Sequence, residues 1–114
     1  MRINTIDFED FSKVQICAGT IIQVEESKKL NKPSFILSID FGKRIGLKKS
    51  SAQLTVNYNT SDLINRQILA VINFKPKQIG NIISEVLVLG LPDEKNEAIL
   101  ISPDLKIENG KRVY

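Results

Sequence analysis

Apolar and polar positions alternate along much of this chain, and the alternation predicts β-strands. The clearest case covers residues 34–41, where every second side chain is large and apolar: Phe35, Leu37, Ile39 and Phe41. A period of two places such residues on one face of a strand. Residues 16–24 show the same period through Ile16, Ala18, Ile22 and Val24. Gly19 lies within this second strand and predicts a bend or bulge there.

Further strands are predicted along the rest of the chain. Residues 45–47 begin a third strand, whose outward positions are basic. Residues 67–74 contain an uninterrupted apolar run, which is typical of a strand buried on both faces or closing a barrel. Pro76 should end the pairing of that strand, because proline has no amide hydrogen to donate. Residues 86–89 and 98–101 then form two more strands.

Two short helices complete the pattern. The first covers residues near 8–12, where Phe8 and Phe11 are three apart and share one side. Ser50 or Ser51 caps the second, at residues 52–56.

The order of these elements is that of an all-β fold, a five-stranded OB-fold β-barrel. It has a short N-terminal helix, a short helix between strands 3 and 4, and C-terminal extension strands, where Asn109-Gly110 signals a hairpin turn. A generic small β-barrel fits the pattern nearly as well. We expect residues 1–114 to form a single domain, since 114 residues with 42% hydrophobic content suit one core.

The composition argues against a membrane protein and against an enzyme. No run reaches the roughly 18 apolar residues of a membrane-spanning helix, and the start lacks the order of a signal peptide. We therefore expect no membrane insertion and a cytoplasmic location. The sequence contains no histidine, and Cys17 is the single cysteine, so the usual general bases and metal ligands are missing. We expect no catalysis, no metal site and no cofactor.

Positive charge is concentrated in the middle of the chain. Residues 41–84 hold seven basic side chains and the single acid Asp62, a net charge of +6 within a total of +3. Such a block attracts phosphate or acidic groups, although a solvated basic face without a partner is equally consistent with it. The candidate nucleic-acid-binding residues are Arg44, Lys48, Lys49, Ser50, Lys75 and Lys77.

Several motifs make the chain similar to a known family. They occupy residues 10–16, 39–42, 45–48, 50–54, 73–77 and 84–90. The most specific are Ser50-Ser51-Ala52-Gln53 and the block Asn73-Phe74-Lys75-Pro76 followed by Ser84-Glu85. On these residues the chain resembles the CsaA family, which belongs to the tRNA-binding domains found also in methionyl-tRNA synthetases and endothelial monocyte-activating polypeptide.

The resemblance implies more than the pattern does. It implies a homodimer built through N- and C-terminal extensions, and a role as an export-related chaperone that binds unfolded precursor proteins and works with the export machinery. Possible tRNA binding is implied alongside. The candidate peptide-binding residues are Asn73, Phe74, Lys75, Pro76 and Ser84.

The chain departs from the family pattern at two places. The family often has Asp-Ile-Arg where Gln15, Ile16 and Cys17 stand, and it tends to have Arg and Gly at the positions of Gln78 and Asn81. Both departures bear on tRNA affinity. Asn81 is a residue type that can adopt the left-handed conformation of a glycine.

Overall fold

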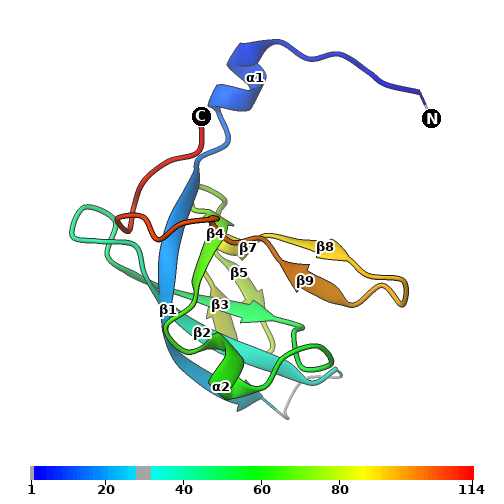
Figure 1. Cartoon of the computed structure of the whole chain (residues 1–114), viewed down its shortest axis with the longest axis vertical. Coiled ribbons are helices and arrows are strands. Elements are labelled where there is room, and N and C mark those ends of the chain that lie inside the picture. Colours follow the sequence, from blue (N-terminus) through cyan, green and yellow to red (C-terminus); the bar gives the residue numbers. More distant parts are fainter. Residues whose placement is uncertain (1, 28–31) are drawn as a thin grey trace.

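The computed structural model describes residues 2–27 and 32–114. In these residues, an antiparallel sheet of five strands curls into a partial barrel in the order β3-β2-β1-β4-β7 (Figure 1). Its strands are β1 (Ile16–Ser27), β2 (Ser34–Asp40), β3 (Leu47–Ala52), β4 (Gln67–Val71) and β7 (Leu87–Val88). The OB-type fold predicted from the sequence is confirmed.

Two helices and two hairpins surround this sheet. They are α1 (Phe8–Ser12), α2 (Thr60–Leu63), the hairpin of β5 (Lys77–Ile79) with β6 (Ile82–Ser84), and the hairpin of β8 (Gly90–Pro92) with β9 (Ala98–Leu100). Figure 1 shows α1 standing away from the barrel near the C-terminus, while the β8–β9 hairpin extends to another side. The two short helices are therefore present: along the sequence, α1 precedes β1 and α2 lies between β3 and β4.

The C-terminal segment runs beside β1 rather than forming a hairpin of its own. The amide of Ala18 donates to the carbonyl of Lys111 (2.9 Å), and the amide of Val113 donates to the carbonyl of Ile16 (2.8 Å). Cys17 and Arg112 form a β-bridge between them. The predicted turn at Asn109-Gly110 exists, but it aligns the tail with β1.

The core follows the alternation predicted for β2. Phe35, Leu37, Ile39 and Phe41 are all at most 2% exposed. They pack with side chains from β1, α2 and β4, namely Ile21, Leu63 and Ile68. Burying such a set of side chains is the main driving force for folding, at roughly 1.5–3 kcal/mol for each.

The predicted parity of β1 is wrong up to Ile22, because Cys17 and Ile21 lie in the core cluster, whereas Val24 packs against that cluster as expected. Ile21 is fully buried, whereas Ile22, expected inside, is 44% exposed. The register against β2 shifts between Ile21 and Gln23, which is a β-bulge, and a bulge exchanges the two faces of the strand that follows it. Gly19 is not the bulge. A β-carbon there would lie 2.7 Å from side-chain atoms of Ile39 and Phe41, so glycine is required by close packing.

The second helix was predicted too early in the chain. Ser50 and Ser51 belong to β3, where they pair with Leu37 and Ile36 of β2. Pairing along the whole edge of β2 outweighs the local preference of serine for a helix start. The helix begins later, and the amide of its N-cap residue Asn59 donates to the carboxylate of Asp62 (2.8 Å).

Candidate functional site

A groove of about 420 Å³ lies where the β5–β6 hairpin meets β3, and we call it the hairpin groove. It is lined by Ser51, Phe74, Lys75, Lys77, Ile79, Ser84, Glu85, Val86 and Leu87. Phe74 and Leu87 are 55% and 50% exposed, so their apolar surfaces are available to a ligand. Lysine, serine and glutamate side chains add charge and hydrogen-bonding groups to the same lining.

Hydrogen bonds between β3 and residues 84–85 fix one wall of the hairpin groove. The amide of Glu85 donates to the carbonyl of Lys49 (2.7 Å), and the amide of Lys49 donates to Oε1 of Glu85 (3.1 Å). The amide of Ser51 donates to Oγ of Ser84 (3.1 Å). These bonds satisfy the outer edge of β3 and give the Ser84 hydroxyl a structural partner.

Asn73 anchors the segment that carries Phe74. Its Nδ2 donates to the carbonyl of Lys13 (2.7 Å), and its Oδ1 accepts from the amide of Gln15 (2.9 Å). Both ends of the amide side chain are therefore used to hold residues 72–77 against the link between α1 and β1. Pro76 is exposed and does not line the hairpin groove.

The hairpin groove gathers three of the predicted basic residues. Lys75 and Lys77 line it, and Nζ of Lys48 lies 3.8 Å from Oε2 of Glu85. Lys48 pairs across the strands with the buried Ile39 and therefore shares the core-facing side of β3. The predicted outward side of this strand is wrong, because Leu47, expected inside, is 62% exposed.

Ser50, Lys49 and Arg44 lie apart from that group. Ser50 is only 1% exposed, and Lys49 projects from the other face of β3. Arg44 lines a different hollow, of about 830 Å³, between the β2–β3 turn and the C-terminal segment. We call this hollow the tail cleft, and its lining comprises Phe41, Gly42, Lys43, Arg44, Glu108, Asn109, Gly110, Lys111 and Arg112.

Sequence reasoning named Arg44 as a candidate but missed the β5–β6 hairpin and the other basic residues of the tail cleft, Lys43, Lys111 and Arg112. The hairpin turn places Gly80 in the left-handed region (φ 61°), and Asn81 does not take that role. The sequence signal for this turn was the Gly80-Asn81 pair between short apolar runs. Lys111 and Arg112 join Lys43 and Arg44 only through tertiary structure.

Two kinds of feature are absent from the described ranges, residues 2–27 and 32–114. No group of three or more histidine, cysteine, aspartate or glutamate side chains in them is placed to hold a metal ion. None of the helices in them is long and apolar enough to cross a membrane.

Comparison with known proteins connects this geometry to relatives. The profile of the family described as "Putative tRNA binding domain" matches residues 16–112. The methionine–tRNA ligase of Pyrococcus horikoshii is 31% identical over 108 residues, which cover 95% of this chain and 14% of the ligase. The chain thus spans about 15% of the length of the curated relatives it matches.

Solved structures match over nearly the whole chain. The chaperone CsaA of Bacillus anthracis superposes with a TM-score of 0.91 and 42% identity, covering 97% of this chain and 100% of that one. The CsaA chaperone protein of Picrophilus torridus gives a TM-score of 0.90 and 47% identity, covering 96% of this chain and 100% of that one. A methionyl-tRNA-synthetase-related protein of P. horikoshii shares the fold at 22% identity, with a TM-score of 0.86 and coverage of 98% of this chain and 100% of that one.

Proposed function

The chain belongs to the tRNA-binding domain family and is CsaA-like, and we propose that it is a homodimeric chaperone that binds unfolded precursor polypeptides. The two structures that support this most strongly are of proteins described as chaperones, at 42% and 47% identity. We propose further that residues 1–114 act as one non-catalytic domain, in the cytoplasm, and deliver precursors to the export machinery.

The mixed lining of the hairpin groove is the observation that carries this proposal. Phe74 and Leu87 offer exposed apolar surface in the same lining as the polar groups of Ser84 and Lys75. An extended polypeptide presents apolar side chains and backbone polar groups in alternation, so it can use both kinds of lining at once. The polar groups of Lys75 and Lys77 reach backbone carbonyls or acidic side chains, and they require no particular sequence.

The dimer proposal rests on exposed apolar side chains near the two ends of the sequence. Ile3, Ile6, Phe8 and Tyr114 are each more than 70% exposed, and Phe8 lies beside Phe11 with ring centroids 6.0 Å apart. Figure 1 shows that α1 stands clear of the barrel, where a second copy can reach it. Analytical ultracentrifugation should give a dimer for the natural chain and a shift toward monomer for Phe8→Ser.

Transfer RNA is the second candidate ligand, favoured by the family match over residues 16–112. The basic side chains proposed to contact phosphates are Arg44, Lys48, Lys49, Lys75 and Lys77. Binding of this kind weakens steeply as salt rises, because it releases condensed cations from the RNA and that release is less favourable when the salt concentration in solution is high.

Polypeptide binding can be tested with reduced, carboxymethylated lactalbumin, which stays unfolded in native buffer. We expect Phe74→Ala and Leu87→Ala to weaken its binding roughly tenfold, as for central apolar contacts of an interface. Leu91→Ala and Leu105→Ala are matched controls, because these residues are exposed but lie outside the hairpin groove. Fluorescence anisotropy measures all four. Equal affinity for the groove and control variants would contradict the proposal.

A further inference from the structure

The tail cleft joins two segments that are far apart in the sequence. Residues 41–44 follow β2, and residues 108–112 belong to the C-terminal segment. Each segment contributes two cations, Lys43 with Arg44 and Lys111 with Arg112, and all four are exposed. Their opposing charge within the cleft is Glu108, so the cleft has a local net charge of +3.

The cleft is built by close backbone contact and does not depend on its charged side chains. Gly42 and Gly110 both have left-handed φ values, of 87° and 92°. A β-carbon on Gly42 would lie 2.9 Å from the carbonyl oxygen of Asn109, and one on Gly110 would lie 2.6 Å from that of Phe41. The turn at Gly42 and the turn at Gly110 therefore pack directly against each other's backbone, because neither glycine has a side chain.

Asn109 secures the C-terminal wall to the sheet. Its Oδ1 accepts from Oγ1 of Thr20 (2.8 Å) and from Nε2 of Gln67 (3.0 Å). The amide of Gly110 donates to the carbonyl of Ala18 (2.8 Å). Lys111 and Arg112 follow directly and are thus held at a fixed distance from the β2–β3 turn.

The cations of the cleft are free to meet a ligand. Within residues 2–27 and 32–114, none of the four takes part in an ion pair. Arg112 uses Nη2 to donate to the carbonyl of Ser12, which orients its guanidinium and leaves other donors free. Burial raises the pKa of the Cys17 thiol, and the positive charges of Arg44 and Arg112 partly oppose that rise. Both guanidinium groups are therefore near enough to Cys17 for their charges to act on its thiol.

The lining favours a phosphate backbone over a polypeptide. Phe41 is the large apolar residue of the cleft, and it is only 1% exposed. The described residues that line the cleft offer no exposed apolar surface against which the apolar side chains of a peptide could pack. Phosphate groups, in contrast, bind to positive charges and backbone amides. The location is also unusual, because OB folds generally bind along strands 2 and 3 and the loops after strands 1 and 4.

We infer that the tail cleft binds the phosphodiester backbone of RNA, with Lys43, Arg44, Lys111 and Arg112 as its phosphate contacts. This inference rests on the proposed tRNA binding and gives it a second surface, separate from the hairpin groove. The chain then has a surface for RNA that a polypeptide in the hairpin groove leaves open.

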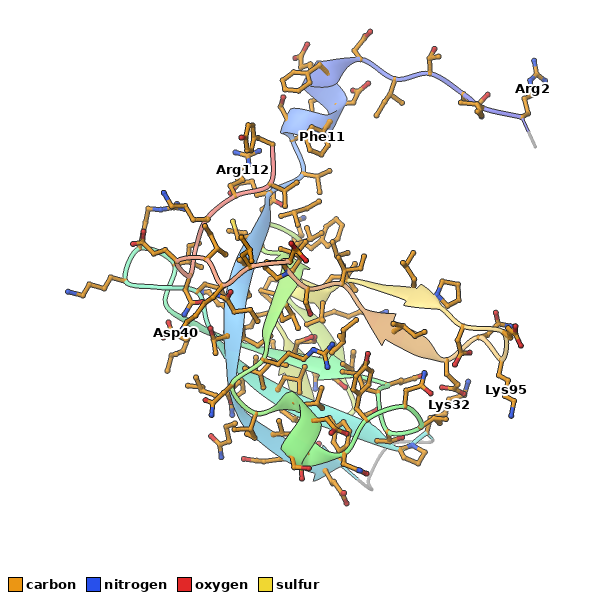
Figure 2. All side chains as sticks on the ribbon, viewed as in Figure 1. Arg2, Phe11, Lys32, Asp40, Lys95 and Arg112 are labelled. Atoms are coloured by element: carbon orange, nitrogen blue, oxygen red, sulfur yellow. The ribbon has the colours of Figure 1, made fainter. Side chains whose placement is uncertain are left out.

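Filter binding of bulk bacterial tRNA at several salt concentrations tests this inference. The variants are Lys43→Ala/Arg44→Ala and Lys111→Ala in the cleft, Lys75→Ala/Lys77→Ala in the hairpin groove, and Lys95→Ala as the matched control for Lys111. Figure 2 shows Lys95 on the β8–β9 side of the molecule, far from Arg112. Circular dichroism confirms that each variant is folded.

We expect Lys43→Ala/Arg44→Ala to lower tRNA affinity roughly tenfold near physiological salt and to reduce the salt slope by about 0.7–0.9 for each lost phosphate contact. Lys111→Ala should lower affinity severalfold, and Lys95→Ala should leave it unchanged.

Three results would overturn the inference. If the loss occurs only in Lys75→Ala/Lys77→Ala, tRNA binding stands and its site is the hairpin groove. If the natural chain binds no tRNA, the tRNA proposal fails together with the cleft. If polyglutamate displaces tRNA from the cleft as well as unlabelled tRNA does, the cleft is a site for acidic peptides.

Discussion

Gly110 lies so close to Phe41 that a β-carbon on it would approach the Phe41 carbonyl oxygen to 2.6 Å. Glycine at this place lets the C-terminal segment pack against the end of β2. The contact links residues that are 69 positions apart by their numbering, and it brings together the two segments that line the tail cleft.

Replacing Gly110 with alanine should therefore destabilise the fold more than replacing Gly46. Gly46 has a similar φ of 88° but nothing within 4 Å of the position of its β-carbon. Gly46→Ala should cost about 1 kcal/mol from its backbone conformation alone, and Gly110→Ala about 2 kcal/mol or more. Urea denaturation gives both free energies of unfolding. Equal losses would show that the contact with Phe41 relaxes without cost.

Glu85 makes two contacts that different substitutions separate. Its carboxylate accepts from the amide of Lys49 and pairs with Lys48 at 3.8 Å. Glu85→Gln keeps an oxygen for the amide and should cost at most about 0.5–1 kcal/mol, because the ion pair is partly exposed. Glu85→Ala loses both contacts and should cost about 1 kcal/mol more. The same loss for both variants would assign the whole effect to charge.

Cys17 should react slowly in the folded protein. Burial raises the pKa of its thiol, with Arg44 and Arg112 opposing the shift, so the folded state favours the neutral form. The stability that depends on this form is full below the thiol pKa of the unfolded chain and is lost as pH rises through the higher pKa of the folded state. Alkylation with iodoacetamide at pH 8 should be slow in buffer and fast in urea. Equal rates would mean that the thiol is accessible.

Asp93 should stabilise the turn of the β8–β9 hairpin in a pH-dependent way. Its pKa is lowered, first by the hydrogen bond from the side chain of Asn57 and then by those from the amides of Glu97 and Lys95. A lowered pKa gives stability that is complete above the pKa of the unfolded chain, about 3.9, and is lost as pH falls through the folded value.

Asp93→Ala should thus be less stable than the natural chain at pH 7, and the difference should shrink in strong acid. Glu94→Ala, at the next position in the same turn, is the matched control and should show little difference at either pH. Thermal unfolding at several pH values between 7 and strong acid measures the difference in stability between each variant and the natural chain. A difference that stays constant down to strong acid would assign the role of Asp93 to packing instead of charge.

The fold could be predicted where the pattern of the sequence and the tertiary contacts agree. Residues 34–41 alternate without interruption, and all four apolar residues are buried as expected. The bulge after Ile21 could not be placed, because either of two adjacent isoleucines fits a strand pattern and only the register with β2 decides between them. Ser50-Ser51 predicts a helix start, because the local sequence does not show that these residues pair with β2.

The candidate sites also divide into parts that the local sequence predicts and parts that depend on long-range contacts. The segment around Phe74, Lys75 and Ser84 was found from its motif, and the structure brings these residues together. Asn73 was expected at the ligand, but its contacts with Lys13 and Gln15 join distant segments that periodicity does not relate. The tail cleft depends on the same kind of long-range contact and left no local signal.

Chemical-shift mapping tests the central proposal, polypeptide binding in the hairpin groove, most directly. Reduced, carboxymethylated lactalbumin is titrated into the 15N-labelled protein, and amide shifts are followed residue by residue. We predict that the largest changes fall at Ser51, Lys75, Ser84 and Leu87, with residues 108–112 unchanged. Changes confined to the tail cleft or to α1, with none in the hairpin groove, would contradict the proposal.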